Sequence, residues 1–494
     1  MNQPKVVIIG GGIAGLCAGV YLRRCGFETE ILEMHSIAGG LATSWGRQGY
    51  TFENCIHWLV GSKEGGALNA SWKEVFDIGR LRFFDDPVYQ VLERGGDIIT
   101  IYRDPDRLEK ELLAKAPEDA AAIKELVGLI RRFARFRFRE GDSIARNAVG
   151  LARMIPYLPA LAKYGKLTMA EYAKRYRNPL LRGFFSEGIA DLSFLALAFS
   201  LGWMADGNAG YPIGGSRAMI ALIEERFRGL GGRIRFQARV ERVLVESGRA
   251  AGVVLAGGET VPAEIVVSAA DGHATIFDLL GGKHVGERIR KVYETFKPFP
   301  SYVQVSLGVD ADLAGEPGFL ALFLDREIRI DPQTAADSVS FRVFHYDPTF
   351  APPGKTAVVA FLGTYNHAYW EELRRADRAG YEAEKRRIAG EVRAVFEKRF
   401  PKAAGQIEVV DVATPATVIR YTGNWRGSME GWLITPGTGV KTLPCVLPGL
   451  KNFYMAGQWI SPGGGLPSGL MTGRMVARRI AKDAGVRWPA SKSR

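Results

Sequence analysis

The 494-residue sequence lacks disulfide patterning, metal-ligand spacing and any apolar run long enough to cross a membrane. Its four cysteines, Cys17, Cys25, Cys55 and Cys445, form no CxxC pair, so neither a disulfide framework nor a zinc cluster is predicted and a reducing compartment is expected. The six histidines show no metal-ligand spacing either, and we expect no metal site. The longest apolar stretch, residues 192–205, is shorter than the roughly 18 residues that a membrane span needs.

Acidic residues are outnumbered, with 53 Asp and Glu against 65 Lys and Arg, which gives a net charge of +12. The surface should therefore attract anions, although charge alone does not choose among nucleic acid, acidic metabolites and anionic lipid. Hydrophobic residues make up 47% and charged residues 24%, the balance of a folded globular protein. The length predicts two or three compact units.

The N-terminus contains a strand, a glycine-rich turn and a helix in succession. Residues 5–9 (KVVII) form a continuous apolar run, which predicts a strand buried on both faces. The run leads directly into GGGIAG at Gly10–Gly15, and from Ile13 the apolar residues recur at helical spacing. Residues 28–33 are predicted to form a second strand.

Each glycine of this turn has a separate role in a dinucleotide site. Gly10 makes the tight turn, Gly12 lets a pyrophosphate approach the backbone, and Gly15 lets the helix pack closely on the strand. The helix N-terminus then faces the phosphates. Glu33 follows Gly12 by about 20 residues, where a carboxylate accepts the ribose hydroxyls. The sequence therefore predicts a dinucleotide-binding site.

A second glycine-rich loop, GGLATS at residues 39–44, follows the second strand. Its backbone amides suit the pyrophosphate or the ribityl chain of a flavin, which favours FAD over NAD. A plain surface turn is the alternative.

These motifs, with GYTFENCIHW at residues 49–58, resemble the phytoene desaturase, carotenoid isomerase and retinol saturase branch of the FAD-dependent amine oxidase superfamily. The resemblance runs almost end to end. Further matching segments are YPIGGS at 211–216, VPAEIVVSAAD at 261–271 and FYMAGQWISPGGGLPSG at 453–469. Many desaturases of this branch carry Asp where this chain has Glu53.

The resemblance implies an α/β fold in which a discontinuous Rossmann-type (GR2-like) FAD-binding domain carries an inserted α+β domain. The FAD-binding domain is expected to comprise residues 1–78, 209–300 and 435–494. Residues 79–208 and 301–434 are expected to form a domain for substrate and membrane association. The first of these inserted blocks reads as helix-like amphipathic runs, and the second contains alternating strands and a helical run at 381–400. Neither repeats the glycine fingerprint, so no nicotinamide domain is predicted.

The predicted FAD-binding residues come from both ends of the chain and from one central strand. Residues 463–469 are expected to lead into a helix at 470–481, whose positive end faces the flavin and favours its anionic reduced form. Val240 is expected to contact adenine through its backbone. The full set is Gly10, Gly12, Ile13, Ala14, Gly15, Glu33, Gly40, Leu41, Val240, Gly457, Gly465, Leu466 and Pro467.

The candidate catalytic residues are His57, Tyr421 and Glu430, as groups that donate, accept or orient a proton beside the flavin. The substrate pocket is predicted to include Trp58, Trp425 and Trp432. For each of these side chains a packing role is the alternative.

The mixed basic and aromatic stretch RRFARFRFR at 131–139 precedes the proline-broken apolar run MIPYLPAL at 154–161. Such a mixture suits an anionic membrane surface, and a solvated helix face is an equal alternative. Nucleic-acid binding is not predicted, because no stacking module accompanies the basic residues.

The sequence thus predicts an FAD-dependent oxidoreductase that desaturates or saturates a carbon–carbon bond of a long apolar polyene, isoprenoid or fatty acyl lipid. The expected location is cytoplasmic, with peripheral association at the inner face of the membrane as an extension. The alternatives are a redox-neutral cis–trans isomerase using reduced FAD, an amine oxidase, and a non-catalytic flavin-binding lipid carrier. No motif identifies the electron donor or acceptor.

Overall fold

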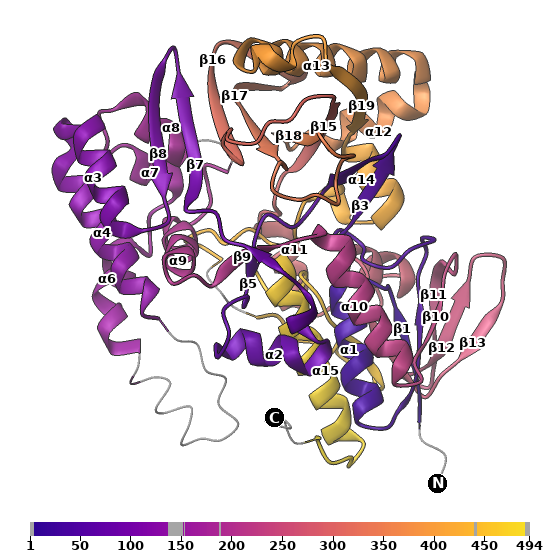
Figure 1. The fold of residues 1–494 in the computed structure, drawn as a ribbon. Helices are drawn as coiled ribbons and strands as arrows, with labels where there is room; N and C mark the ends of the chain where they lie inside the picture. The colour runs from indigo at the N-terminus through magenta and orange to yellow at the C-terminus, as the bar shows by residue number, and fades with distance from the viewer. Residues whose placement is uncertain (1–3, 137–151, 153, 187–188, 439–441, 490–494) are drawn as a thin grey trace.

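The computed structural model describes residues 4–136, 152, 154–186, 189–438 and 442–489. The chain has an α/β fold built around two large sheets (Figure 1). The first is parallel and contains the N-terminal strand, and the second is mainly antiparallel. A block of helices lies beside the second sheet.

The first sheet contains five parallel strands in the order β10-β2-β1-β14-β20. Alternate residues of β1 face opposite layers: Val6 and Ile8 belong to the core under the helices, whereas Val7 and Ile9 pack toward a small antiparallel sheet. Burial on both faces explains the unbroken apolar run. The strands are β1 (Lys5–Ile9), β2 (Glu28–Leu32), β10 (Arg233–Arg235), β14 (Ile265–Ser268) and β20 (Phe453–Met455), and the covering sheet is β11 (Val240–Glu246), β12 (Arg249–Leu255) and β13 (Thr260–Pro262).

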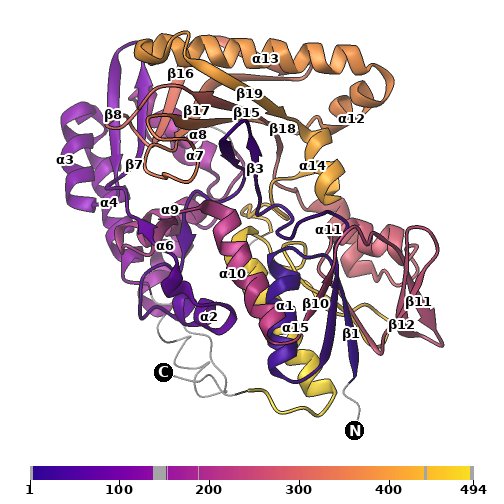
Figure 2. The same cartoon turned by 45° about the vertical axis from the view of Figure 1, so that its right-hand side comes forward.

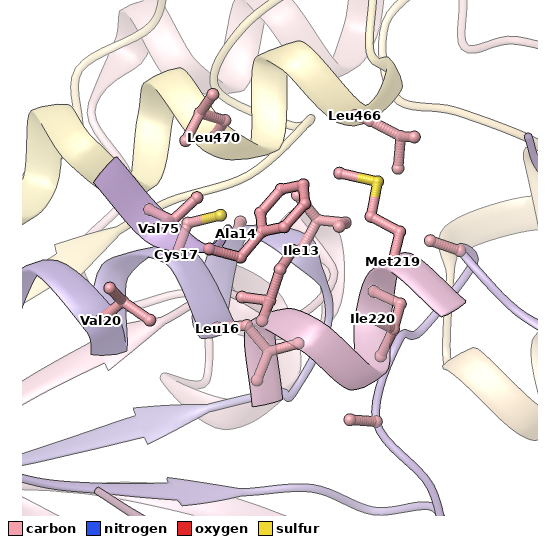
Figure 3. Close-up of a cluster of buried hydrophobic side chains, with 14 of the residues drawn as sticks. Ile13, Ala14, Leu16, Cys17, Val20, Val75, Met219, Ile220, Leu466 and Leu470 are labelled. Atoms are coloured by element: carbon pink, nitrogen blue, oxygen red, sulfur yellow. The ribbon is translucent and has the colours of Figure 1, made fainter. Parts of the chain in front are cut away.

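Three helices from distant parts of the chain cover the other face: α1 (Ile13–Arg24), α10 (Gly215–Gly229) and α15 (Gly465–Asp483). They lie side by side in both ribbon views (Figures 1 and 2). Side chains of all three helices meet around α1 in a single buried apolar cluster that includes Ile13, Met219 and Leu470 (Figure 3). The N-terminal and C-terminal motifs are thereby brought into one layer.

Helices α1 and α15 approach each other unusually closely. A Cβ added to Gly473 would lie 2.8 Å from the carbonyl oxygen of Ala14 and 2.9 Å from the backbone nitrogen of Ala18. A Cβ added to Gly469 would lie 2.5 Å from a methyl carbon of Ile13. Glycine on α15 therefore lets the two backbones come nearly into contact, as small residues do in tightly crossing helices.

The second sheet has seven strands in the order β19-β15-β18-β17-β16-β7-β8, and helices α12 and α13 pack against it (Figure 2). The predicted helical run at 381–400 corresponds to α13, which is longer by a few residues at its start. The elements are β7 (Val88–Arg94), β8 (Asp97–Tyr102), β15 (Ser301–Val309), β16 (Phe319–Asp331), β17 (Thr334–Val343), β18 (Thr356–Thr364), β19 (Ile407–Ala413), α12 (His367–Ala376) and α13 (Arg378–Arg399).

The expectation of helix-like structure throughout 79–208 is wrong for residues 88–102. They form the β7–β8 hairpin, whose β7 pairs in parallel with β16 and so extends the second sheet. The sequence contained a signal for this hairpin, because paired glycines between two β-rich runs are typical of a tight turn. These glycines are Gly95 and Gly96, and both adopt positive φ in the turn, at +57° and +95°.

The rest of the 79–208 block is helical and has its own apolar core. Within it α9, which contains the longest apolar run, stacks Phe199 on Phe133 of α4 with ring centroids 4.0 Å apart. Among the described residues no helix is both long and apolar enough to cross a membrane. The helices are α3 (Pro105–Lys115), α4 (Ala120–Ala134), α6 (Leu158–Tyr164), α7 (Met169–Ala173), α8 (Pro179–Ser186) and α9 (Phe194–Ala205), with short turns η2 (Pro117–Asp119) and η3 (Ile155–Tyr157).

A small sheet lies where the chain passes from the first sheet to the helical block and back, and in it β9 pairs with both β5 and β6. The remaining elements connect the two large sheets and the helical block. They are β3 (Ser44–Arg47), β4 (Tyr50–Glu53), β5 (Leu59–Val60), β6 (Phe83–Phe84), β9 (Ala209–Pro212), α2 (Ala67–Val75), α11 (Glu287–Thr295), α14 (Pro415–Thr422), η1 (Ile78–Arg80), η4 (Ala274–Leu279), η5 (Pro401–Ala403) and η6 (Trp425–Gly427).

We predict that Gly473→Ala lowers the thermal midpoint of unfolding, by the equivalent of about 1–3 kcal/mol, because the added methyl group overpacks the α1–α15 contact. The matched control is Gly390→Ala in α13, where an added Cβ meets no atom within 4 Å. That control should be stabilised by up to about 1 kcal/mol, the helix preference of alanine over glycine. Equal midpoints for the two variants, measured by differential scanning fluorimetry, would contradict the close α1–α15 approach.

Candidate functional site

The turn between β1 and α1 is built from bare backbone. Gly10 has a φ of +96° and donates its N–H to the Leu32 carbonyl at 2.9 Å, which closes the turn. A Cβ on Gly15 would lie 2.0 Å from the Gly10 carbonyl oxygen, so only glycine lets the helix sit on the turn. Gly12 precedes the helix without a side-chain cap, and the first N–H groups of α1 are left for a ligand. An anion fits this position.

Glu33 is buried at the edge of this turn, with 5% of its surface exposed. One carboxylate oxygen accepts the Gly11 N–H at 2.6 Å and the other accepts the His35 N–H at 2.8 Å. The Glu33 carbonyl accepts the Ala238 N–H at 2.9 Å, so the segment that leads to Val240 runs alongside. The structure thus brings Glu33 and the backbone before Val240 together at one end of the turn.

The second glycine-rich loop lies directly against the first. Gly39 has a φ of +124° and donates its N–H to the Gly11 carbonyl at 2.9 Å. A Cβ on Gly40 would lie 3.5 Å from the Cα of Gly12. Because neither Gly40 nor Gly12 has a side chain, their backbones lie against each other, and Leu41 follows directly.

The C-terminal motif reaches the first turn of α1 through Gly457. This residue has a φ of +108°, donates its N–H to the Thr472 hydroxyl at 2.9 Å, and would place an added Cβ 3.6 Å from the Cβ of Ala14. Ile13 and Ala14 therefore lie between the N-terminal turn and the C-terminal motif. Sequence spacing alone could not show that contact, because more than 400 positions separate the segments.

Helix α15 begins at Gly465 and not at residue 470, so the predicted start was too late by five residues. Gly463, Gly464 and Gly465 all adopt positive φ, which turns the chain sharply into the helix. Leu466 and Pro467 then lie in the first turn, where proline is tolerated because its missing N–H needs no partner. As in α1, no side chain caps the helix.

These segments together fit a flavin dinucleotide. Two uncapped helix N-termini, two facing glycine loops and one buried carboxylate lie around the first turn of α1. The predicted cofactor residues at both chain ends are therefore brought together, and the backbone that leads to Val240 lies beside Glu33.

Glu430 lies against the start of α15. A Cβ on Gly464 would be 2.6 Å from one of its carboxyl oxygens, and a Cβ on Gly465 would be 3.6 Å from the other. Burial raises the pKa of Glu430 to about 8. Within the described part of the chain no hydrogen bond or ion pair offsets that burial, so at neutral pH Glu430 is mainly a protonated acid.

His57 also stays uncharged. Burial, helped by the nearby positive charge of Arg342, holds the pKa of the imidazole well below its usual range. Its Nε2 atom is buried and finds no hydrogen-bond partner among the described residues. The ring packs edge-on against Phe361, with centroids 5.5 Å apart, and lies beside Trp58. A buried ring nitrogen without a partner suits a substrate-facing group better than a core histidine.

The loop that carries His57 is anchored by Glu53, which is fully buried. Its carboxylate accepts the N–H groups of Cys55 and Ile56 at 2.9 and 3.0 Å and both the N–H and the hydroxyl of Ser216. Burial raises the pKa of Glu53, and these donors oppose the increase. Glu53 therefore ties the 53–57 loop to the start of α10 and sets where His57 lies.

The segments that carry the two proton groups both contact the chain around the start of β15. The Met429 N–H donates to the Pro300 carbonyl at 3.0 Å, and the Tyr302 hydroxyl donates to the Asn54 side chain. Glu430 and His57 therefore lie on two segments that β15 connects.

Tyr421 is placed elsewhere. It is 43% exposed, and its ring packs edge-on against His35, two residues from Glu33. The guanidinium of Arg420 lies 4.1 Å from the ring centroid. The structure does not bring Tyr421 to Glu430 or His57.

The predicted pocket tryptophans separate into two groups. Trp58 contacts Tyr89, with ring centroids 6.0 Å apart, and faces the helical block. Trp425 and Trp432 instead pack 6.0 Å apart in an aromatic cluster on the first sheet, where Trp425 stacks on His273 at 5.0 Å. Trp432 has no exposed surface, and its indole N–H donates to a backbone carbonyl at 2.9 Å. Trp432 is therefore a core residue, because its one polar atom is satisfied internally.

Two polar residues that position this region were not predicted. The amide oxygen of Asn424 accepts the indole N–H of Trp459 at 2.9 Å and so joins the 421–432 segment to the C-terminal motif. Asp271 accepts the Trp425 N–H at 2.8 Å, and burial raises the pKa of its carboxyl to about 7. Asn424 stands between glycine and tryptophan in YTGNW, and Asp271 ends a predicted strand, but neither position reveals its distant partner.

We predict that Glu430→Gln stabilises the protein progressively as pH rises from about 4.5 to about 8. A carboxyl whose pKa is raised from 4.5 to about 8 by folding contributes stability that is present below about pH 4.5 and is lost as pH rises to about 8. The variant should match the wild type near about pH 4, exceed its thermal midpoint increasingly above that pH, and keep a constant excess of about 2–4 °C above about pH 8. Asp271 is present in both proteins, so its contribution to the pH dependence cancels in the difference between their thermal midpoints. The exposed control Glu241→Gln should show no such pH-dependent difference; a pH-independent offset in Glu430→Gln would refute the buried, protonated state.

Comparison with known proteins agrees with a flavin site in this glycine-lined cradle, formed by the two glycine loops, the starts of α1 and α15, and Glu33. The family model described as flavin containing amine oxidoreductase matches residues 13–481. A chloroplastic prolycopene isomerase of Daucus carota is 24% identical over 98% of this chain and 81% of its own length. A lycopene-forming phytoene desaturase of Paracoccus sp. is 25% identical over 97% of both chains. Recognition of this branch from the sequence motifs is confirmed.

A solved structure shares the fold. A triple mutant of putrescine oxidase with redesigned cofactor binding aligns with a TM-score of 0.64 over 97% of this chain and 99% of its own, at 15% identity. The fold class expected from the sequence is confirmed. With the family model matching nearly the whole chain, and with its residues forming the glycine-lined cradle, this chain belongs to the flavin-containing amine oxidoreductases and is an FAD-dependent oxidoreductase.

Proposed function

We propose that this enzyme desaturates or saturates a carbon–carbon bond in a long apolar substrate, such as a polyene, an isoprenoid or a fatty acyl lipid. The observation that carries the proposal is the unpartnered, uncharged Nε2 of His57, which is buried among aromatic side chains. Similarity over almost the full length to a phytoene desaturase supports the substrate class.

We also propose that FAD is held by the predicted cofactor set, with Glu33 at the ribose, the glycine turn before α1 at the pyrophosphate and the start of α15 at the flavin ring. Bound FAD would supply the acceptor or donor of a hydride. The chain's own residues manage the proton on the neighbouring carbon. Glu430 can release a proton near neutral pH, and the neutral ring of His57 can accept one at Nε2.

The absence of charge on both groups suits an apolar substrate. An ionised side chain would have to be desolvated whenever a hydrocarbon chain lay beside it, at a cost of several kcal/mol. Trp58 and Phe361 flank His57 and offer flat apolar surfaces to a conjugated chain.

A redox-neutral isomerase is the second candidate, because a prolycopene isomerase matches 98% of this chain. The same residues would then take up and return a proton without net reduction or oxidation of the substrate. Oxidation of a small amine is not favoured, since Trp425 stacks on His273 and Trp432 is fully buried beside Trp425, so neither is available to form an aromatic cage.

The test is anaerobic titration of the purified holoprotein with lipids extracted from it, followed by mass spectrometry of the products. A desaturase bleaches its flavin and removes two hydrogens from the substrate, a saturase adds two to it while oxidising reduced flavin, and an isomerase changes no mass. We expect His57→Gln to lower the rate by roughly 10²–10⁴-fold at unchanged flavin content. Tyr421→Phe is the control and should retain the rate; loss of activity only in the tyrosine variant would reverse the assignment.

We further propose that the enzyme is cytoplasmic and associates peripherally with the inner face of the membrane. In the 131–139 stretch the described aromatic rings pack inward: Phe133 and Phe136 both contact Tyr157. Residues 137–139 lie outside the described residues. Among the described residues of 131–139 and 154–161, the exposed large apolar side chains are Ile155 and Leu158, at 62% and 51%. We propose these two side chains as the membrane contact.

Substitution of both Ile155 and Leu158 by serine should weaken flotation with anionic vesicles by at least roughly tenfold, since each side chain loses about 1.5–3 kcal/mol of burial in the bilayer. Ile98→Ser removes another exposed isoleucine, 41% exposed, from the β7–β8 hairpin and should leave flotation unchanged. Equal flotation of the double variant and the wild type would disprove this contact.

The domain division follows as part of the same proposal. Residues 1–78, 209–300 and 435–494 contain the first sheet and its covering helices, and residues 79–208 and 301–434 contain the helical block and all seven strands of the second sheet. We propose that the former bind FAD and the latter bind the substrate and the membrane.

A further inference from the structure

Arg342 is a buried cation that the proposed proton chemistry does not use. It lies on β17 with 7% of its surface exposed, and its Nε is buried without a hydrogen-bond partner. In the portion of the chain that is described, its side chain makes no hydrogen bond and no ion pair. Its guanidinium carbon lies 3.4 Å from the ring centroid of Phe319 and 5.9 Å from that of Trp58. An arginine buried among rings without a carboxylate is costly to retain.

The charges around Arg342 do not neutralise it. The charge of Asp86 raises the pKa of Arg342 without an ion pair between the two side chains. One Asp86 oxygen already accepts the Val88 N–H at 2.8 Å. Arg103 adds a second positive charge, also has a buried Nε without a partner, and donates to the Ala209 carbonyl at 3.1 Å. Burial lowers the pKa of Arg342 to about 10, so the group still carries its charge at neutral pH.

Arg342 belongs to the same region as the candidate substrate site. Its charge helps to keep His57 neutral, and its plane lies near Trp58, the residue that follows His57. Phe319 faces Arg342 across β16 and β17, where the two residues pair directly. Aromatic surface and one unpaired guanidinium are therefore found together, next to a proton-transfer group.

We propose that Arg342 binds a carboxylate on the substrate, so that the enzyme acts on apolar chains that end in a carboxylic acid and not on pure hydrocarbons. This inference rests on the proposed function and narrows its substrate class. A guanidinium presents two parallel N–H groups that match both oxygens of one carboxylate. The acid end would lie at Arg342 while the apolar chain extends past Trp58 and His57.

The test compares how tightly oleic acid, methyl oleate and oleyl alcohol bind to the holoprotein. Binding is measured from the change in flavin absorbance and from the thermal shift. These probes share a chain and differ at the head group. We expect the acid to bind roughly 10- to 100-fold more tightly than the ester or the alcohol, as for hydrogen bonds to a charged group. Arg342→Met should reduce acid binding to the level of the ester at unchanged flavin content.

Two further variants separate binding from structure. Arg342→Lys keeps the charge but not the paired donors and should retain part of the preference for the acid. Arg326→Met removes an exposed arginine of β16 and controls for net charge, so it should keep the full preference. Because Arg342→Met removes a buried unpaired charge, the ligand-free variant should be at least as thermally stable as the wild type.

Acid binding no tighter than ester binding in the wild type, or a preference that survives Arg342→Met, would overturn the inference. If Arg342→Met yields no folded protein, the wild type and Arg342→Lys still decide it. Binding is read without turnover, so the two proposals fail separately. Lack of substrate-dependent bleaching would count against the proposed reaction, whereas bleaching without a preference for acids would count against the carboxylate site alone.

Discussion

The approach of bare backbone to bare backbone around the first turn of α1 is the constraint on which the rest of the structure depends. Gly15 lies on the carbonyl of Gly10, Gly40 faces Gly12, and Gly473 lets α15 come within contact of α1. Gly15 and Gly473 need to lack a Cβ because an added methyl group would overlap backbone atoms that cannot rotate away, and the position of Gly40 favours glycine because its φ is +61°. Segments from both ends of the chain thereby surround one position with unpaired N–H groups, which is the arrangement that a dinucleotide requires.

A second constraint concerns charge. The site keeps its ionisable groups neutral by burying them: Glu430 retains its proton, and His57 does without one. Glu53 shows what it takes to bury an acid with a structural role, since it is surrounded by N–H and hydroxyl donors. Arg342 lacks such partners, and this difference separates a side chain that holds the fold from one that is available to a ligand.

The sequence was a good guide wherever local spacing carries the information and a poor one for the substrate side. The strand, turn and helix at the N-terminus and the acid at Glu33 form one continuous unit, and all of them lie where the motif requires. Tyr421, Trp425 and Trp432 come from a segment whose composition suited a pocket, yet Tyr421 lies at the surface and Trp432 in the core. Composition cannot tell these outcomes apart, because an aromatic ring serves equally well in a wall, a core or an exposed stack.

The amino-acid sequence by itself determined the α/β fold, the glycine turns and the flavin dinucleotide site, because glycines and strand periodicity act over a few residues. The tertiary structure alone decided which distant groups meet: Gly457 with Ala14, Glu430 with the start of α15, Asn424 with Trp459, and Arg342 with Phe319 and Trp58. Those meetings depend on how sheets and helices pack across hundreds of residues. Burial, which sets the protonation of His57 and Glu430, exists only once that packing is complete.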